Sequence, residues 1–121
     1  MPRILAGSSH GKNPIVESYL KGLDYCQDLD PASVRETPVN EPLINWHSYD
    51  GELALRAVRE TEGWAGDASD REMLRQARGL REKEGLSVLP ASTVGLSVLL
   101  SRHRKEPLPG DRYVVVLTGR R

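Results

Sequence analysis

The sequence predicts a three-layer α/β fold in which a short, mostly parallel sheet is flanked by helices. Three observations support this prediction. Strand-like and helix-like segments alternate along the 121 residues. The run Tyr-Val-Val-Val-Leu at residues 113–117 is typical of a buried strand. Ser69 and Glu72 form a capping box, which starts a helix. A chain of this length supports one core, so we expect a single domain over residues 1–121.

The first elements are short. Residues 4–6 form an apolar run that predicts a buried strand. Pro14 suits the first turn of a helix, so residues 14–21 are predicted to be helical, with Gly22 as a left-handed C-cap. Residues 23–49 show little periodicity and contain three prolines. A stretch of this length without regular structure indicates either a functional segment or one that packs against something outside the chain.

The next elements have clearer boundaries. Asp50 is the expected N-cap of a helix that runs to about Glu62, and residues 64–68 are a candidate short strand. Ser69 then starts a helix that ends at Glu84. The face expected to be buried in the first of these helices comprises Leu53, Ala54, Ala57, Val58 and Thr61.

Two further strands and one helix complete the prediction. Residues 86–89 are a strand candidate that Pro90 closes. Residues 91–103 form a helix whose apolar side chains surround most of its circumference, so much of it is expected to be buried. Residues 113–117 form the last strand, and Thr118 follows at its carboxyl end.

The composition excludes several classes of function. Lys and Arg number 17, and so do Asp and Glu, which argues against binding nucleic acid through bulk positive charge. No apolar run approaches the length of a membrane span, and the first residues lack a signal-peptide pattern, so a soluble cytoplasmic protein is expected. Cys26 is the only cysteine and the three histidines are isolated, so neither a disulfide nor a metal site is expected.

Three segments leave alternatives open. The loop at residues 7–12 joins a strand to a helix but lacks the spacing of a phosphate loop, which leaves a looser anion site at the helix start. Trp46 either anchors a capped helix start on the core or belongs to a ligand pocket or docking surface. Thr118 is either a plain strand end or a hydroxyl that bonds a ligand ring nitrogen beyond the sheet.

Two blocks of sequence carry a family resemblance. They are Glu-Gly-Leu-Ser-Val-Leu-Pro-Ala-Ser at residues 84–92, and Gly-Asp followed by Val-Val-Val-Leu-Thr-Gly within residues 110–119. In this order they resemble the C-terminal part of threonine synthase and related pyridoxal-phosphate enzymes of fold type II, the tryptophan-synthase-β fold. The resemblance spans residues 2–119, with supporting blocks at 13–16, 40–46, 54–61, 63–65 and 69–74.

The resemblance implies a partial large domain of that fold and a set of contacts with pyridoxal phosphate. Thr118, followed by Gly119, corresponds to the threonine whose hydroxyl contacts the pyridine nitrogen. Pro90, Ala91 and Ser92 correspond to a helix start beside the cofactor ring. Leu89 stands where the family usually has an acidic residue.

The resemblance also implies that this chain has no catalytic residue of its own. In the family, the lysine that forms the Schiff base and the glycine-rich phosphate loop belong to a preceding portion. The lysines of this chain, Lys12, Lys21, Lys83 and Lys105, lie in different sequence contexts. We therefore expect no tight cofactor binding by the chain alone, and the missing N-terminal half is the expected partner.

Two functions follow for the chain. The first is a fragment of a threonine-synthase-like lyase of amino-acid biosynthesis, which we expect to be inactive alone. The reaction of the parent family removes phosphate from O-phosphohomoserine and adds water to give threonine. The second is a stand-alone, non-enzymatic module that binds a small ligand or a protein through residues 23–49, with a homodimer as its simplest form.

Overall fold

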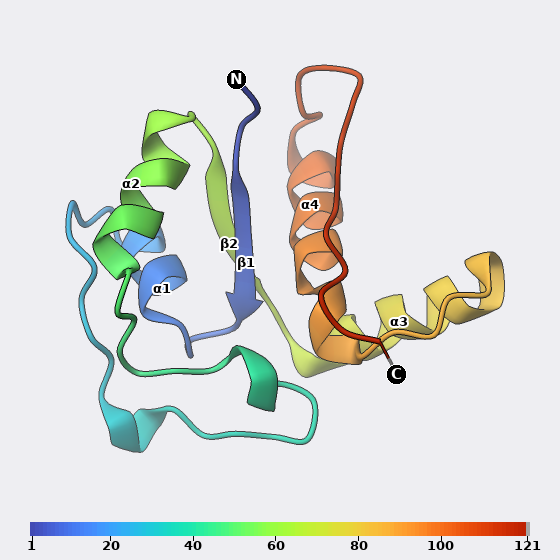
Figure 1. Ribbon diagram of the computed structural model, residues 1–121, viewed down its shortest axis with the longest axis horizontal. Coiled ribbons are helices and arrows are strands. Elements are labelled where there is room, and N and C mark those ends of the chain that lie inside the picture. The colour runs from blue at the N-terminus through green and yellow to red at the C-terminus, as the bar shows by residue number, and fades with distance from the viewer. Residues whose placement is uncertain (121) are drawn as a thin grey trace.

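A computed structural model describes residues 1–120 and has an α/β architecture around two parallel strands (Figure 1). β1 (Leu5–Ser9) pairs with β2 (Trp64–Ala68), with Leu5 opposite Trp64 and Ser9 opposite Ala68. The helical layers comprise α1 (Pro14–Leu20), α2 (Gly51–Glu60), α3 (Asp70–Glu84) and α4 (Val94–Lys105). α1 and α2 lie on one side of the strands and α4 on the other, while α3 projects away from the sheet (Figure 1).

Two of the predicted strands are absent from the described residues. Residues 86–89 and 113–117 are extended but belong to no sheet, and an antiparallel bridge between Val88 and Arg120 is the one ladder contact they make. Val114 is 91% exposed and Val116 is 70% exposed, so the prediction of a buried strand at 113–117 is wrong. A strand needs a neighbour to pair its backbone, and no other strand of residues 1–120 lies beside this segment. The predicted multi-stranded sheet is therefore two-stranded.

Helix starts follow local capping chemistry. The Asn13 side chain accepts hydrogen bonds from the N–H groups of Ile15 and Val16, which starts α1. The Ser69 hydroxyl accepts from the Glu72 N–H at 3.2 Å, which is one of the two bonds of the predicted capping box; the reciprocal bond from the Ser69 N–H to the Glu72 carboxylate is not formed. Asp50 is the N-cap residue of α2, but its side chain makes no capping bond. The predicted N-cap position of α2 is therefore confirmed, whereas the predicted capping hydrogen bond from the Asp50 side chain is wrong.

The core lies where α4 meets the strands. Val98 packs so closely on Gly66 that a Cβ there would lie 2.8 Å from its Cγ1, and at Gly7 the corresponding distance to Val98 Cγ2 is 3.0 Å. Small residues on both strands therefore let the helix approach the backbone. On the opposite face, α2 buries Leu55 and Val58, whereas Leu53 is 62% exposed and was wrongly placed in the buried face.

The irregular segment packs against the chain itself. Val39 and Leu43 lie against the core cluster, and Asn40 is 1% exposed. The Ser8 hydroxyl donates to the Leu43 carbonyl at 3.2 Å, and the Thr37 hydroxyl donates to Asp70 at 2.6 Å. Residues 37–43 thus cover the carboxyl ends of the strands. Part of the irregular stretch therefore packs against the chain itself.

Within residues 1–120, every helix is too short or too polar to cross a lipid bilayer.

Candidate functional site

The residues singled out by the family resemblance meet at one corner of the molecule. Pro90, Ala91 and Ser92 belong to the short 3₁₀ helix η3 (Pro90–Thr93), immediately before α4. The Ser92 hydroxyl lies 3.1 Å from the carbonyl oxygen of Gly119 and 2.7 Å from that of Leu89. The Leu89 N–H donates to the same Gly119 carbonyl at 3.2 Å. Segments 27 residues apart are therefore joined directly.

Gly119 fits this corner because it has no side chain. A Cβ at this position would lie 2.7 Å from Leu89 Cδ1 and 3.4 Å from its Cβ, so the end of the Leu89 side chain would have to move to admit a larger residue. Thr118 precedes it on the exposed side of the segment. Figure 1 shows the C-terminus at the end of the molecule toward which the β1 and β2 arrows point.

The polar groups at the corner differ in their availability. Ser92 is 4% exposed, and its hydroxyl donates its one proton to backbone carbonyls. The side chain therefore stabilises the contact between the two segments. The Thr118 hydroxyl makes no hydrogen bond with any described residue and is open to solvent. A pyridine nitrogen accepts one hydrogen bond, and a threonine hydroxyl supplies one. The corner therefore presents one exposed hydroxyl that can donate a hydrogen bond.

The four lysines of the chain belong to none of the segments that form this corner. The lysines lie on other elements: Lys12 in the β1–α1 loop, Lys21 at the C-cap of α1, and Lys83 and Lys105 in the last turns of α3 and α4. The part of the chain that the structure describes also holds no cluster of three or more potential metal ligands.

The helix start after β1 leaves no anion site. Asn13 Oδ1 already accepts from the N–H groups of Ile15 and Val16 at 3.0 and 3.1 Å, and Glu17 adds a negative charge to the first turn of α1. These N–H groups are the ones an anion would use. The anion-site alternative for this loop is therefore wrong.

A histidine–carboxylate pair joins the ends of the two strands. His10 follows β1, and its Nδ1 lies 2.8 Å from Asp67 Oδ2 on β2. The hydrogen bond to Asp67, together with its negative charge, raises the pKa of His10 above its ordinary value. The His10 side chain is 78% exposed, and no nucleophile is hydrogen-bonded to it among residues 1–120. The pair is therefore a surface link between strands.

The aromatic cluster before α2 lies on the surface. Trp46 and Tyr49 are 47% and 96% exposed, and both rings contact the His47 imidazole, which bonds Asp28 at 2.7 Å. Trp46 is therefore not the core anchor that one interpretation of this segment required. Cys26 is half-buried beside α2, and burial raises the pKa of its thiol, so it is a weak nucleophile.

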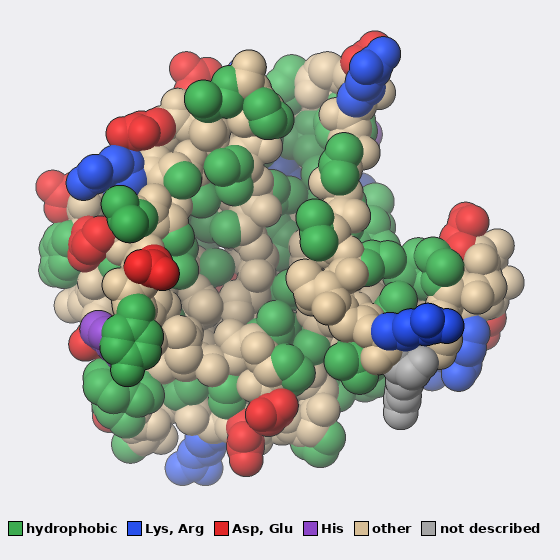
Figure 2. Space-filling model, viewed as in Figure 1, with side chains coloured by type: hydrophobic (Ala, Val, Ile, Leu, Met, Phe, Trp, Pro, Cys, Tyr) green, Lys and Arg blue, Asp and Glu red, His purple; other side chains and the backbone are tan. Residues whose placement is uncertain are grey.

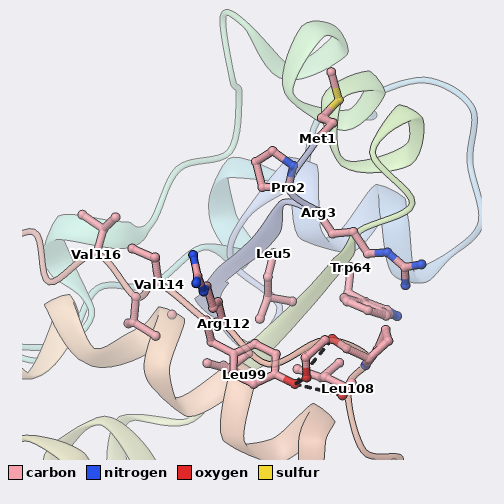
Figure 3. Close-up of a pocket in the computed structure, with 15 residues that line it drawn as sticks. Met1, Pro2, Arg3, Leu5, Trp64, Leu99, Leu108, Arg112, Val114 and Val116 are labelled. Atoms are coloured by element: carbon pink, nitrogen blue, oxygen red, sulfur yellow. Dashed lines mark hydrogen bonds between the residues drawn. The ribbon is translucent and has the colours of Figure 1, made fainter.

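Sequence reasoning missed a cavity whose lining does not include the residues of this corner. It has a volume of about 620 Å³ and lies between the start of β1, α4 and residues 112–116 (Figure 3). Its walls come from segments far apart in sequence, so no local pattern could have indicated it.

Neither a family model nor a curated protein sequence matches the chain.

Proposed function

We propose that this chain is the C-terminal wall of a pyridoxal-phosphate enzyme resembling threonine synthase, and that it is inactive by itself. One observation carries the proposal. The two blocks that most resemble the family, ending at Ser92 and Gly119, are hydrogen-bonded to each other in the folded chain. Residues far apart in sequence that meet beside an exposed hydroxyl form the kind of corner on which a ring can rest.

Thr118 is the residue that we assign to the cofactor. Its hydroxyl would donate to the pyridine nitrogen, while Leu89 and Ser92 hold the segment in place through their hydrogen bonds to the Gly119 carbonyl. Bound pyridoxal phosphate supplies an electron sink for carbanions. A neutral hydroxyl partner leaves the ring nitrogen largely unprotonated, which suits replacement and elimination at the β and γ carbons.

Inactivity follows from what a Schiff-base enzyme requires. Its lysine must be desolvated and adjacent to the ring, and a phosphate clamp must fix the orientation of the cofactor. The four lysines of this chain lie on elements other than η3 and the Thr118 segment. We infer that the complementary residues come from a separate polypeptide or from a preceding portion of a longer protein.

Amide chemical shifts of the full chain, recorded during titration with pyridoxal phosphate, test the assignment of Thr118. We expect weak binding, with amide shifts concentrated at residues 89, 91, 92, 118 and 119. Thr118→Ser keeps the hydroxyl and should retain the shifts, whereas Thr118→Val is nearly isosteric and should lose them. The assignment would be overturned if the chemical-shift changes occurred only outside this corner, or if the changes at the corner persisted in Thr118→Val.

Borohydride reduction tests the second half of the proposal. After incubation with pyridoxal phosphate, the chain should carry no adduct concentrated on one lysine when it is digested and analysed by mass spectrometry. A single, stoichiometrically modified lysine would show that the chain contains its own Schiff-base residue.

A further inference from the structure

The cavity beside β1 is a groove with three walls. Its floor is α4, represented by Gly95 and Leu99, one wall is β1 with the residues that precede it, and the other wall is residues 112–116 (Figure 3). Neither Ser92 nor Thr118 lines it. Figure 2 shows apolar side chains along the C-terminal segment and a hollow between that segment and the body of the molecule.

The β1 wall presents unpaired backbone groups to the groove. The Ile4 carbonyl accepts from the Trp64 N–H, and the His10 N–H donates to the Ala68 carbonyl, so the even-numbered residues of β1 face β2. Because alternate residues of a parallel strand face opposite neighbours, Leu5 and Gly7 direct their N–H and C=O groups to the other edge. No strand of residues 1–120 pairs there.

The opposite wall is also an unpaired extended segment. Among the described residues, the backbone of residues 112–116 makes no backbone hydrogen bond. Three consecutive valines favour a strand, yet Val114 is 91% exposed. The segment and β1 run in the same direction on the two sides of the groove (Figure 1). A strand between them would find donors and acceptors on both sides.

Side chains in the groove define the chemistry of its occupant. Leu5, Leu99 and Val115 give it apolar surface, and the only charged side chains that line it are Arg3 and Arg112. Arg3 pairs with Glu62 at 3.6 Å, whereas Arg112 makes no ion pair within residues 1–120. The unpaired charge of Arg112, with no carboxylate among the lining side chains, favours a ligand with negative charge.

We propose that this groove binds an extended segment of a partner polypeptide, which adds a strand between β1 and residues 112–116. The segment is apolar and carries an acidic residue at one end, because Arg3 precedes β1 and Arg112 begins the parallel wall, so both cations lie at the same end of the groove. Backbone pairing supplies the affinity, and the alternating side chains and the charged end supply the selectivity. The interaction needs neither Thr118 nor a cofactor, so it stands independently of the proposed enzyme function.

The test is binding of a blocked heptapeptide, Glu-Val-Thr-Val-Thr-Val-Glu, to the full chain, followed by amide chemical shifts and hydrogen exchange. We expect shifts at Leu5, Gly95 and residues 112–116, and slower exchange of the amides of Leu5, Gly7 and alternate residues within 113–116. A peptide with proline at the central valine loses a ladder bond and should bind at least about tenfold more weakly. Replacing both glutamates by lysine should have a similar effect.

Two pairs of variants separate the groove from general effects on the fold. Gly95→Leu fills the floor, because a Cβ there meets only Val115 Cγ1 at 4.0 Å and the remaining side chain would extend into the groove. Gly79→Leu makes the same change in α3, where nothing lies within 4 Å of the added Cβ. Arg112→Glu reverses a lining charge, and Arg78→Glu reverses one on α3. Only Gly95→Leu and Arg112→Glu should weaken binding, each by about tenfold or more.

Several results would overturn the proposal. These are no detectable binding of the heptapeptide at millimolar concentration, equal binding of the proline peptide, and unchanged binding by Gly95→Leu. A dimer in sedimentation that Gly95→Leu dissociates, while Gly79→Leu does not, would assign the groove to a second copy of the chain instead.

Discussion

At the scale of single residues, a hydrogen bond between the side chains of His10 and Asp67 links the ends of β1 and β2. The imidazole Nδ1 and the carboxylate oxygen lie 2.8 Å apart. The hydrogen bond and the charge of Asp67 stabilise the protonated ring, so the pKa of His10 is raised above 6.5 in the folded chain. The unfolded chain has no such partner, which makes folding stability depend on pH through this residue.

We expect the pair to stabilise the fold at mildly acidic pH and to stop doing so at alkaline pH. The contribution is fully present below the ordinary histidine pKa of 6.5 and is lost as pH rises through the higher folded pKa. His10 is exposed, so the contribution should stay below about 1 kcal/mol. An NMR titration of the imidazole in the wild type and in Asp67→Asn measures the shift. A pKa unchanged by Asp67→Asn would contradict this account.

Local chemistry explains which of these single residues the sequence could predict. A capping serine acts on an N–H three residues away, so Ser69 and Glu72 were predicted together and are found together. The link between His10 and Asp67 spans 57 residues and depends on the strand register, which no local pattern contains. The corner formed by Ser92 and Gly119 lies between these cases. Resemblance supplied Ser92 and Gly119, and only the folded chain places them 3.1 Å apart.

At the scale of elements, the start of β2 depends on a glycine that permits close backbone approach. A Cβ at Gly63 would overlap the carbonyl oxygen of Ile4. That carbonyl accepts from the Trp64 N–H at 3.1 Å, the first bond between the two strands. The Gly63 carbonyl in turn accepts from the Tyr19 hydroxyl, which ties α1 to the same point.

Gly63→Ala should therefore separate the strand starts. We expect the free energy of unfolding to fall by at least about 2 kcal/mol, because backbone cannot rotate away as a side chain can. Gly79→Ala is the matched control. It lies in α3 with nothing within 4 Å of the new Cβ, and should gain up to about 1 kcal/mol from helix propensity. Urea denaturation measures both, and equal stability of the two variants would refute the strand-start argument.

Helices and strands differ in what a sequence reveals about them. α1, α3 and α4 were predicted with nearly correct limits, because caps, breakers and periodicity act within the segment itself. Residues 113–117 have the composition of a strand but no neighbour among residues 1–120 to pair with. Strand propensity indicates readiness to pair, whereas the sheet depends on a partner. The prediction of a strand at residues 113–117 is wrong, and the groove beside this segment is open, for the same reason. The segment has no strand to pair with among residues 1–120.

At the scale of the whole molecule, the layers are closed on one side and open on the other. Residues 37–43 cover the carboxyl ends of β1 and β2, and α1 and α2 cover one face of the sheet (Figure 1). Beyond the free edge of β1, the described part of the chain provides only the extended C-terminal segment, which packs on α4. Exposed apolar surface next to unpaired backbone is a known route to self-association.

Threonine substitutions of four valines test this division between closed and open regions. Val114 and Val116 are 91% and 70% exposed, so Val114→Thr with Val116→Thr should change the free energy of unfolding by less than about 0.5 kcal/mol. The same double change should reduce self-association, measured by sedimentation at increasing concentration. Val94 and Val98 are 7% and 5% exposed. Because the added hydroxyls would be buried, Val94→Thr and Val98→Thr should each cost about 1–3 kcal/mol.

Thermal and urea unfolding of the four variants decide whether the C-terminal segment belongs to the folded core. If Val114→Thr with Val116→Thr proved as damaging as Val98→Thr, these side chains would be buried in solution. The segment would then already have a neighbour, supplied by another copy of the chain or by a closed conformation. The groove beside β1 would be occupied, and the proposed site for an added strand would not exist in the isolated protein.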